Sequence, residues 1–168
     1  NFTIFGMGGK SSNVFETQRD TSLWEDDKDR QDIDFQSQMG ALGFTHLLPI
    51  KNIGVWKTTF VASTVRSTRT ANLLNFSNNN FEIRPFQSAV SEESKNSINS
   101  NIDIKLAKKF RLKTGITTTE ISPNYRYGIN YKIDSSEILV NSLGSGWLIR
   151  PFSELEINLH QQLKINIG

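Results

Sequence analysis

Apolar and polar side chains alternate with a period of two along much of this chain. Between residues 96 and 106 the odd positions are polar and most even positions are apolar: Ser97, Asn99, Asn101, Asp103 and Lys105 against Ile98, Ile102, Ile104 and Leu106. Successive side chains of a β-strand point to opposite faces, so the pattern predicts a strand with one apolar and one polar face. A half-buried strand of a soluble sandwich and a membrane-spanning barrel strand share this period. The pattern alone therefore leaves open what each face contacts.

Strand-like patterns occur in seven segments, whereas the 3.6-residue spacing of an amphipathic helix is hard to find. β-branched and aromatic residues, which favour strands, are frequent in these segments. The predicted strands are Phe2–Gly9, Phe35–Leu48, Val55–Thr68, Asn96–Leu106, Leu112–Ile121, Gly146–Leu159 and Leu163 to the end. The predicted fold class is therefore all-β.

The connections between these strands alternate strictly between short and long. Three have the size of hairpin turns: Pro49–Gly54, Ala107–Arg111 and His160–Gln162. Three are long: Lys10–Asp34, Arg69–Lys95 and Ser122–Ser145. In an antiparallel up-and-down meander this alternation places the short turns at one end and the long loops at the other, as in outer-membrane barrels. The sequence therefore favours part of a transmembrane β-barrel over a sandwich.

Aromatic residues lie near both ends of this predicted meander. Trp56 and Phe110 lie beside short turns, and Trp147 lies towards the long loops. Membrane barrels carry aromatic girdles at both interfaces, although ordinary strand aromatics would give the same pattern.

Composition excludes several other classes of protein. The 19 basic and 17 acidic residues are dispersed, so the sequence does not predict a nucleic-acid partner. The absence of cysteine excludes disulfide frameworks and thiolate zinc sites. No stretch approaches the roughly 20 apolar residues of a membrane helix, whereas barrel strands need only about 9 to 11 residues each. The chain begins and ends inside alternating runs, so we expect residues 1–168 to be a piece of a longer chain.

Three stretches in about the first third of the chain carry a family resemblance: FTIFGMGGKSSNVF, WEDDKDRQDIDFQSQMGALGFTHLLPIKN and WKTTF. They resemble the barrel of a TonB-dependent outer-membrane receptor, from the subgroup with a carboxypeptidase-regulatory-like N-terminal domain. The matching residues are Phe5, Gly6, Gly8, Gly9, Ser11, Ser12, Trp24, Arg30, Asp32, Phe35, Ser37, Met39, Gly40, Gly43, His46, Lys57, Thr58 and Thr59. The remaining residues share only the rhythm of strands and loops.

The resemblance implies a location in the bacterial outer membrane and a role in import. Such receptors resemble a 22-stranded barrel around a plug, so residues 1–168 would supply about a third of the wall, in contact with lipid. They import scarce ligands such as iron chelates, cobalamin, glycans or peptides, with energy from the TonB complex, and some have a lipoprotein lid. No plug domain is recognisable in this sequence. A passive porin or adhesin barrel, or a soluble carbohydrate-binding sandwich, remains an alternative.

The long loops are where we expect ligand capture, because loops on a rigid scaffold commonly carry binding residues. The candidates are Trp24, Asp26, Asp27, Asp29, Tyr125, Tyr127 and Tyr131. The aspartates belong to an acidic run that suits either calcium or a solvated loop. This run lacks the glycine and final glutamate of an EF-hand, and Lys28 and Arg30 offset its charge.

Parity also predicts which strand residues face the lumen. They are Asn99, Asn101, Asp103, Lys105, Arg150, Glu154, Glu156 and Asn158. Their predicted role is hydrogen bonding to the plug, to water or to a passing solute.

Motifs for catalysis or cofactor binding are missing from the sequence. The run GMGG lacks the context of a dinucleotide fingerprint or a P-loop, and LGSGW lacks the spacing of a nucleophile elbow. With only His46 and His160, a histidine metal site or a catalytic triad has few possible members. We therefore expect no catalytic residue, no metal and no cofactor.

Overall fold

The computed structural model describes residues 1–26, 28–78, 80–132, 135–160 and 163–168, which are almost entirely β-structure. The strands are β1 (Phe2–Phe15), β2 (Gln31–Ile50), β3 (Gly54–Ser77), β4 (Asn80–Ala107), β5 (Phe110–Lys132), β6 (Ser135–Leu143), β7 (Gly146–His160) and β8 (Leu163–Ile167). A single 3-10 turn, η1 (Thr21–Leu23), lies between β1 and β2. Within these ranges, no helix is long and apolar enough to cross a membrane.

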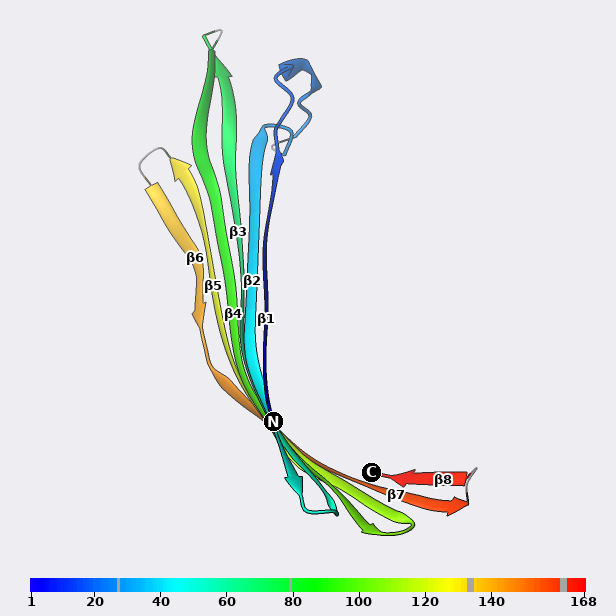
Figure 1. Ribbon diagram of the computed structural model, residues 1–168. Helices are drawn as coiled ribbons and strands as arrows, with labels where there is room; N and C mark the ends of the chain where they lie inside the picture. The colour runs from blue at the N-terminus through cyan, green and yellow to red at the C-terminus, as the bar shows by residue number, and fades with distance from the viewer. Residues whose placement is uncertain (27, 79, 133–134, 161–162) are drawn as a thin grey trace.

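One curved antiparallel sheet contains every strand described, in the order β1-β2-β3-β4-β5-β7-β8, with β6 also paired to β5 (Figure 1). β7 pairs with the first half of β5, up to Ile121, and β6 pairs with the second half, from Asn124. β6 and β7 therefore act as one interrupted strand. Pro123 lies opposite the interruption and, as a proline, has no N–H to donate to the ladder. The sheet is thus an up-and-down meander with seven positions.

Two of the three predicted long connections are wrong. β3 and β4 extend through most of the segment 69–95, and β5 and β6 extend through most of the segment 122–145. The first connection is real but covers residues 16–30 rather than 10–34. The loop end of the meander therefore consists mainly of long β-hairpins.

The apolar and polar positions of these extensions do not alternate with a regular period of two, so the residues there carry no clear strand signal. β3 reads Thr68, Arg69 and Thr70 in succession, where the pairing with β4 is nevertheless continuous. Backbone hydrogen bonds between strands need no apolar pattern, so the ladder continues where the sequence signal stops. A turn signal was available at Asn78, which has a φ of 50°, since asparagine tolerates left-handed backbone.

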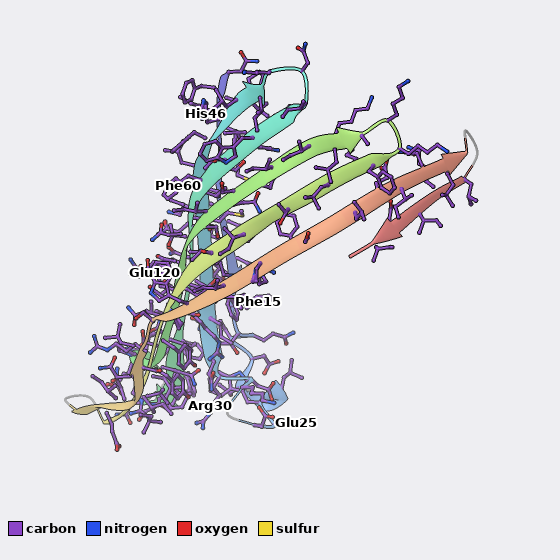
Figure 2. The ribbon with its side chains drawn as sticks, turned by 90° about the horizontal axis from the view of Figure 1, so that it is seen from below. Phe15, Glu25, Arg30, His46, Phe60 and Glu120 are labelled. Carbon is purple, nitrogen blue, oxygen red and sulfur yellow. The ribbon has the colours of Figure 1, made fainter. Side chains whose placement is uncertain are left out.

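The register gives the sheet two faces of opposite character. One row on what we call the apolar face contains Ile4, Phe44, Phe60, Ile98, Thr118 and Ile149. The adjacent row on the opposite side, the polar face, contains Thr3, Thr45, Thr59, Asn99, Thr117 and Arg150. Figure 2 shows His46, Phe60 and Glu120 on one side of the sheet and Phe15 on the other.

No second layer covers either face in the part of the chain described. The buried apolar side chains are Ala71, Leu73 and Leu74, all near the loop end of β3. Phe2 and Ile4 on the apolar face remain 76% and 78% exposed. A soluble sandwich would bury one parity of each strand between two sheets. The described strands thus form a single sheet rather than a sandwich.

Candidate functional site

Hydrogen bonds link polar side chains along the polar face of β4 and β5. Asn99 Nδ2 donates to Thr117 Oγ1 over 2.6 Å, and Asn101 Nδ2 donates to Asn99 Oδ1 over 2.7 Å. One row further from the turns, the hydroxyls of Ser97 and Thr119 lie 3.0 Å apart. The register forces these contacts because paired residues share a face.

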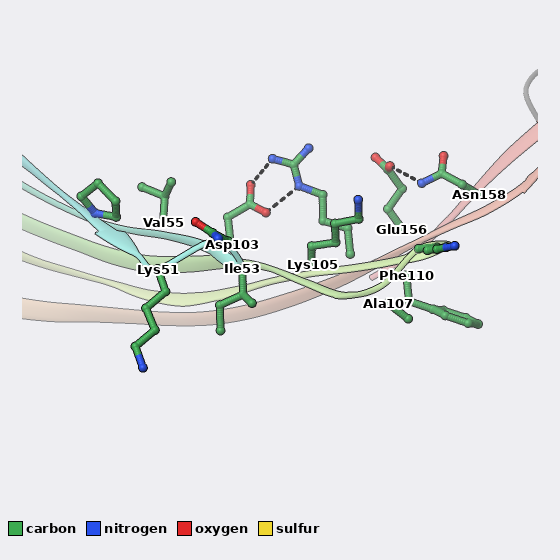
Figure 3. Close-up of a pocket in the computed structure, with 14 residues that line it drawn as sticks. Lys51, Ile53, Val55, Asp103, Lys105, Ala107, Phe110, Glu156 and Asn158 are labelled. Carbon is green, nitrogen blue, oxygen red and sulfur yellow. Dashed lines mark hydrogen bonds and ion pairs between the residues drawn. The ribbon is translucent and has the colours of Figure 1, made fainter.

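Charged residues gather at the turn end of the same face. Arg111 Nε and Nη2 donate to the two carboxylate oxygens of Asp103 over 2.6 and 2.7 Å, a bidentate geometry. Asn158 Nδ2 donates to Glu156 Oε1 over 2.9 Å, and Lys164 Nζ lies 3.7 Å from the same oxygen. Figure 3 shows Asp103, Glu156 and Asn158 rising from one side of the sheet, around a hollow of about 580 Å³.

All eight residues predicted to face a lumen lie on the polar face. Register places them there in cross-strand rows: Asn99 with Arg150, Asp103 with Glu154, Lys105 with Glu156, and Asn101 and Asn158 in the neighbouring rows. Phe152 also lies on this face, opposite Gly115, so the face is not uniformly polar.

A second hollow, of about 520 Å³, opens on the polar face nearer the loops. A cross-strand row lines it, formed by Ser11, Ser37, Ser67, Ser91 and Tyr125. Beside this row, Arg69 Nη1 donates to Gln87 Oε1, and Gln87 Nε2 donates to the hydroxyl of Tyr127. The Arg69 guanidinium also lies 5.7 Å from the ring centroid of Phe35.

Sequence reasoning missed Arg69 and Gln87 because the segment 69–95 read as a loop. The signal that would have found Gln87 is the parity of β4, which continues with polar Ser91, Glu93 and Lys95. Tyr125 and Tyr127, predicted as loop residues, instead belong to β5; Tyr125 lines this hollow, and the Tyr127 hydroxyl accepts a hydrogen bond from Gln87.

The other predicted ligand-binding residues lie in a different place. Trp24, Asp26 and Asp29 belong to the 16–30 connection, so the structure does not bring them together with the tyrosines. Asp27 lies outside the described residues, as does the side chain of Tyr131.

The carboxylates of the acidic run bind their own backbone. Asp29 Oδ2 accepts hydrogen bonds from the N–H groups of Glu25 (2.9 Å) and Asp26 (3.0 Å), and Asp26 Oδ1 accepts one from Lys28 (2.6 Å). The hydrogen bonds donated by the backbone N–H groups of Asp26 and Glu25 stabilise the ionised Asp29 carboxylate and hold its pKa below the usual range. In the described part of the chain, no three acidic or histidine side chains come together as a metal site.

Aromatic contacts dock the 16–30 connection on the β3–β4 hairpin. Trp24 lies 6.2 Å from Phe81 between ring centroids, and its Nε1 donates to the carbonyl of Gln18 over 2.8 Å. The Arg19 guanidinium lies 5.9 Å from the Phe81 ring and pairs with Asp32 at 2.9 Å. Trp24 thus has a structural role in this structure.

Aromatic residues mark the apolar face near both of its limits. Trp56 lies near the turns and donates from Nε1 to Ser100 Oγ over 2.9 Å, so its polar atom is satisfied within the sheet. Trp147 lies three rows further along the same face, opposite Glu120. His46 stacks on Phe2 with a centroid distance of 4.4 Å on this same face.

No family model and no curated protein matches this chain. Among solved structures, the chain is similar to the ferric-catecholate import receptor Fiu from E. coli K12 in its open form, with a TM-score of 0.55 and 13% sequence identity. The similarity covers 96% of this chain and 31% of the receptor, so the chain spans about a third of that structure. The likeness is one of fold: an antiparallel meander like that in the β-barrel of a transport receptor.

Proposed function

We propose that the chain forms part of the barrel wall of a TonB-dependent outer-membrane receptor that imports a scarce ligand. The observation that carries the proposal is the single two-faced sheet, whose exposed apolar face has no protein partner among the described residues. Hydrocarbon satisfies such a face, provided that every backbone N–H and C=O is paired within a closed ladder. The polar face then borders the lumen.

The extent of the apolar face supports a membrane band in the turn-proximal half of the sheet. Beyond the row of Phe60 and Ile98 this face becomes polar on β4 and β5, where Asn96 Nδ2 donates to Glu120 Oε2 over 3.4 Å. β4 has 28 residues, or about 95 Å at ~3.4 Å per residue, against a hydrocarbon core of about 30 Å. The hairpins at the loop end would therefore extend into the extracellular water.

In this proposal the eight polar-face residues border the lumen and hydrogen-bond to the plug, to water or to solute. Tyr125 contributes to ligand capture at the loop-end hollow, and Tyr127, Tyr131, Trp24, Asp26, Asp27 and Asp29 are the other residues proposed for ligand capture. The ligand belongs to the iron chelates, cobalamins, glycans or peptides. A plug, the TonB complex and a lipoprotein lid would act through the full-length protein.

The proposed subgroup, with a carboxypeptidase-regulatory-like domain, rests only on the sequence resemblance in the first third of the chain. A passive porin or adhesin would share the same wall physics. Uptake that stops when the TonB complex is removed would separate a receptor from either of these.

A matched pair of substitutions tests the assignment of the two faces. Ile98→Arg places a charge on the apolar face, and Asn99→Arg places it on the polar face one residue away. In the full-length protein we expect Ile98→Arg to cost about 2–4 kcal/mol of barrel stability. We expect Asn99→Arg to assemble normally, as judged by heat-modifiable gel mobility of outer-membrane fractions. Equal assembly of both variants, or loss of Asn99→Arg alone, would overturn the assignment.

A further inference from the structure

We propose that the apolar face carries a binding groove for a phosphorylated lipid, with an acyl chain along β1–β3 and the phosphate held by Lys10, Gln38 and Arg66. The inference rests on the proposed membrane position of this face. The inference goes further than that position, because a surface can face lipid without having a site for one kind of lipid.

The apolar end of the groove is a hollow of about 400 Å³ on the first three strands. Its lining is almost wholly hydrocarbon: Phe2, Ile4, Leu42, Gly43, Phe44, Phe60 and Ala62. The aromatic walls Phe44 and Phe60 have ring centroids 5.7 Å apart. A hollow of this composition accommodates an acyl chain and offers nothing to a polar ligand.

Two further hollows, of about 550 and 450 Å³, adjoin the first towards the loops. The middle hollow shares Leu42 and Ala62 with the apolar one and shares Gly40 and Thr64 with the outermost one. Gly40 and Ala62 have small side chains, so the backbone of the sheet forms the floor of the groove here. A Cβ atom added at Gly40 would meet nothing within 4 Å, so the space beside this backbone is open.

The outer end of the groove is cationic. Lys10, Gln38 and Arg66 form one cross-strand row on the apolar face of β1, β2 and β3. Arg66 Nε lies 4.0 Å from Glu92, and the arginine side chain is 50% exposed. Lys10 has no charged partner among the residues described. Neighbouring strands are about 4.8 Å apart, so the long Lys10 and Arg66 side chains can reach one phosphate group above the Gln38 amide of the strand between them.

Charge complementarity selects the occupant. The row lies six residues beyond Phe44 along β2, which is about 20 Å at ~3.4 Å per residue, or roughly the separation of a headgroup from the end of its acyl chain in a bilayer about 40 Å thick. Basic residues next to a membrane attract anionic headgroups, and a guanidinium or ammonium binds phosphate with charge-assisted hydrogen bonds. A neutral lipid would fill the apolar hollow but leave Lys10 without a counter-charge, because Glu92 lies beside Arg66.

The test uses the full-length protein in detergent, with lipid binding measured by native mass spectrometry. The probes are dioleoyl phosphatidic acid and dioleoylglycerol, which share acyl chains and differ in the phosphate. We expect the wild type to prefer the phosphatidate, and the double variant Lys10→Gln, Arg66→Gln to bind it about tenfold more weakly with little change for dioleoylglycerol. Both substitutions are at exposed positions, so they leave the fold intact.

Occupation of the groove is tested by a second pair of variants. Gly40→Leu fills the groove and should reduce binding of both lipids, whereas Gly146→Leu is the matched control. A Cβ at Gly146 also meets nothing within 4 Å, but Gly146 lies on the polar face of β7, away from the groove. Its lipid binding should therefore equal that of the wild type.

The outcomes that overturn the inference differ from those that overturn the proposed function. Equal binding of the two lipids by the wild type, or unchanged phosphatidate binding in the double variant, overturns the groove while the Ile98→Arg result still stands. Competition by inorganic phosphate alone would assign the cationic row to a free anion and would also overturn it. If the apolar face does not contact lipid at all, Ile98→Arg assembles normally and neither lipid binds.

Discussion

Asp20 and Asp29 show how single carboxylates order the connection between β1 and β2. Asp20 accepts hydrogen bonds from the hydroxyl and the N–H of Ser22, which hold the pKa of its carboxyl below the usual range. Asp29 accepts hydrogen bonds from the N–H groups of Asp26 and Glu25, and these also lower the pKa of its carboxyl. The acidic run that suggested a calcium loop is therefore used to cap its own turns.

A lowered pKa makes the order of this connection depend on pH. A carboxylate with a folded-state pKa below its unfolded value of about 3.9 stabilises the fold above that pH, and the effect is lost as the pH falls through the folded pKa. We expect Trp24 emission, in a variant with Trp56→Phe and Trp147→Phe, to shift only below about pH 4. Adding Asp20→Asn and Asp29→Asn should remove this transition. An unchanged transition in that variant would contradict the role of the two carboxylates.

At the scale of elements, the β3–β4 hairpin and the 16–30 connection form one unit. The buried residues Leu73 and Leu74 lie at this contact, and the N–H of Leu74 donates to the carbonyl of Arg30 over 2.8 Å. This is the part of the described chain in which side chains are shielded by another segment. The hairpin is thus held by water-excluding contacts beyond the proposed membrane band.

Removing the aromatic contact should release the connection without affecting the rest of the sheet. We expect Phe81→Ala to cost about 1–2 kcal/mol of local stability, because it removes the ring contacts with Trp24 and Phe76. Hydrogen exchange at the N–H groups of Leu23, Trp24 and Leu74 would then speed up. The control is Phe44→Ala, which removes another aromatic pair on the sheet and should leave these amides unchanged. Equal exchange in both variants would show that Phe81 does not fasten the connection.

At the scale of the whole molecule, a single sheet leaves much of its apolar surface uncovered. Trp147 and Ile149 are 66% and 60% exposed, and β1 and β8 each have a free edge. Exposed apolar patches and unpaired strand edges both promote association in water.

The isolated chain, residues 1–168, should therefore need detergent. We expect it to elute from size-exclusion chromatography as large aggregates in buffer and as smaller particles once detergent covers the apolar face. A monodisperse, soluble monomer at high concentration without detergent would contradict both the exposed face and the proposed membrane position.

The period of two was enough to determine the strand class and the face of each residue in the predicted strands. Side-chain parity is a local property of extended backbone, so Asn99 and Ile98 take opposite faces in any sheet that includes them. The short turns at Pro49–Gly54 and Ala107–Arg111 follow from equally local signals, and the structure confirms turns there.

Only the tertiary structure decided how far the strands continue and which residues meet. The extension of β3 and β4 depends on backbone pairing between distant segments, which polar sequences such as the run around Arg69 do not reveal. The row from Ser11 to Tyr125, and the groove ending at Lys10 and Arg66, arise from the register between strands. Register is set by hydrogen bonds between strands that are distant in the sequence. The sequence therefore indicates on which face a residue lies, but not which residues of other strands lie beside it.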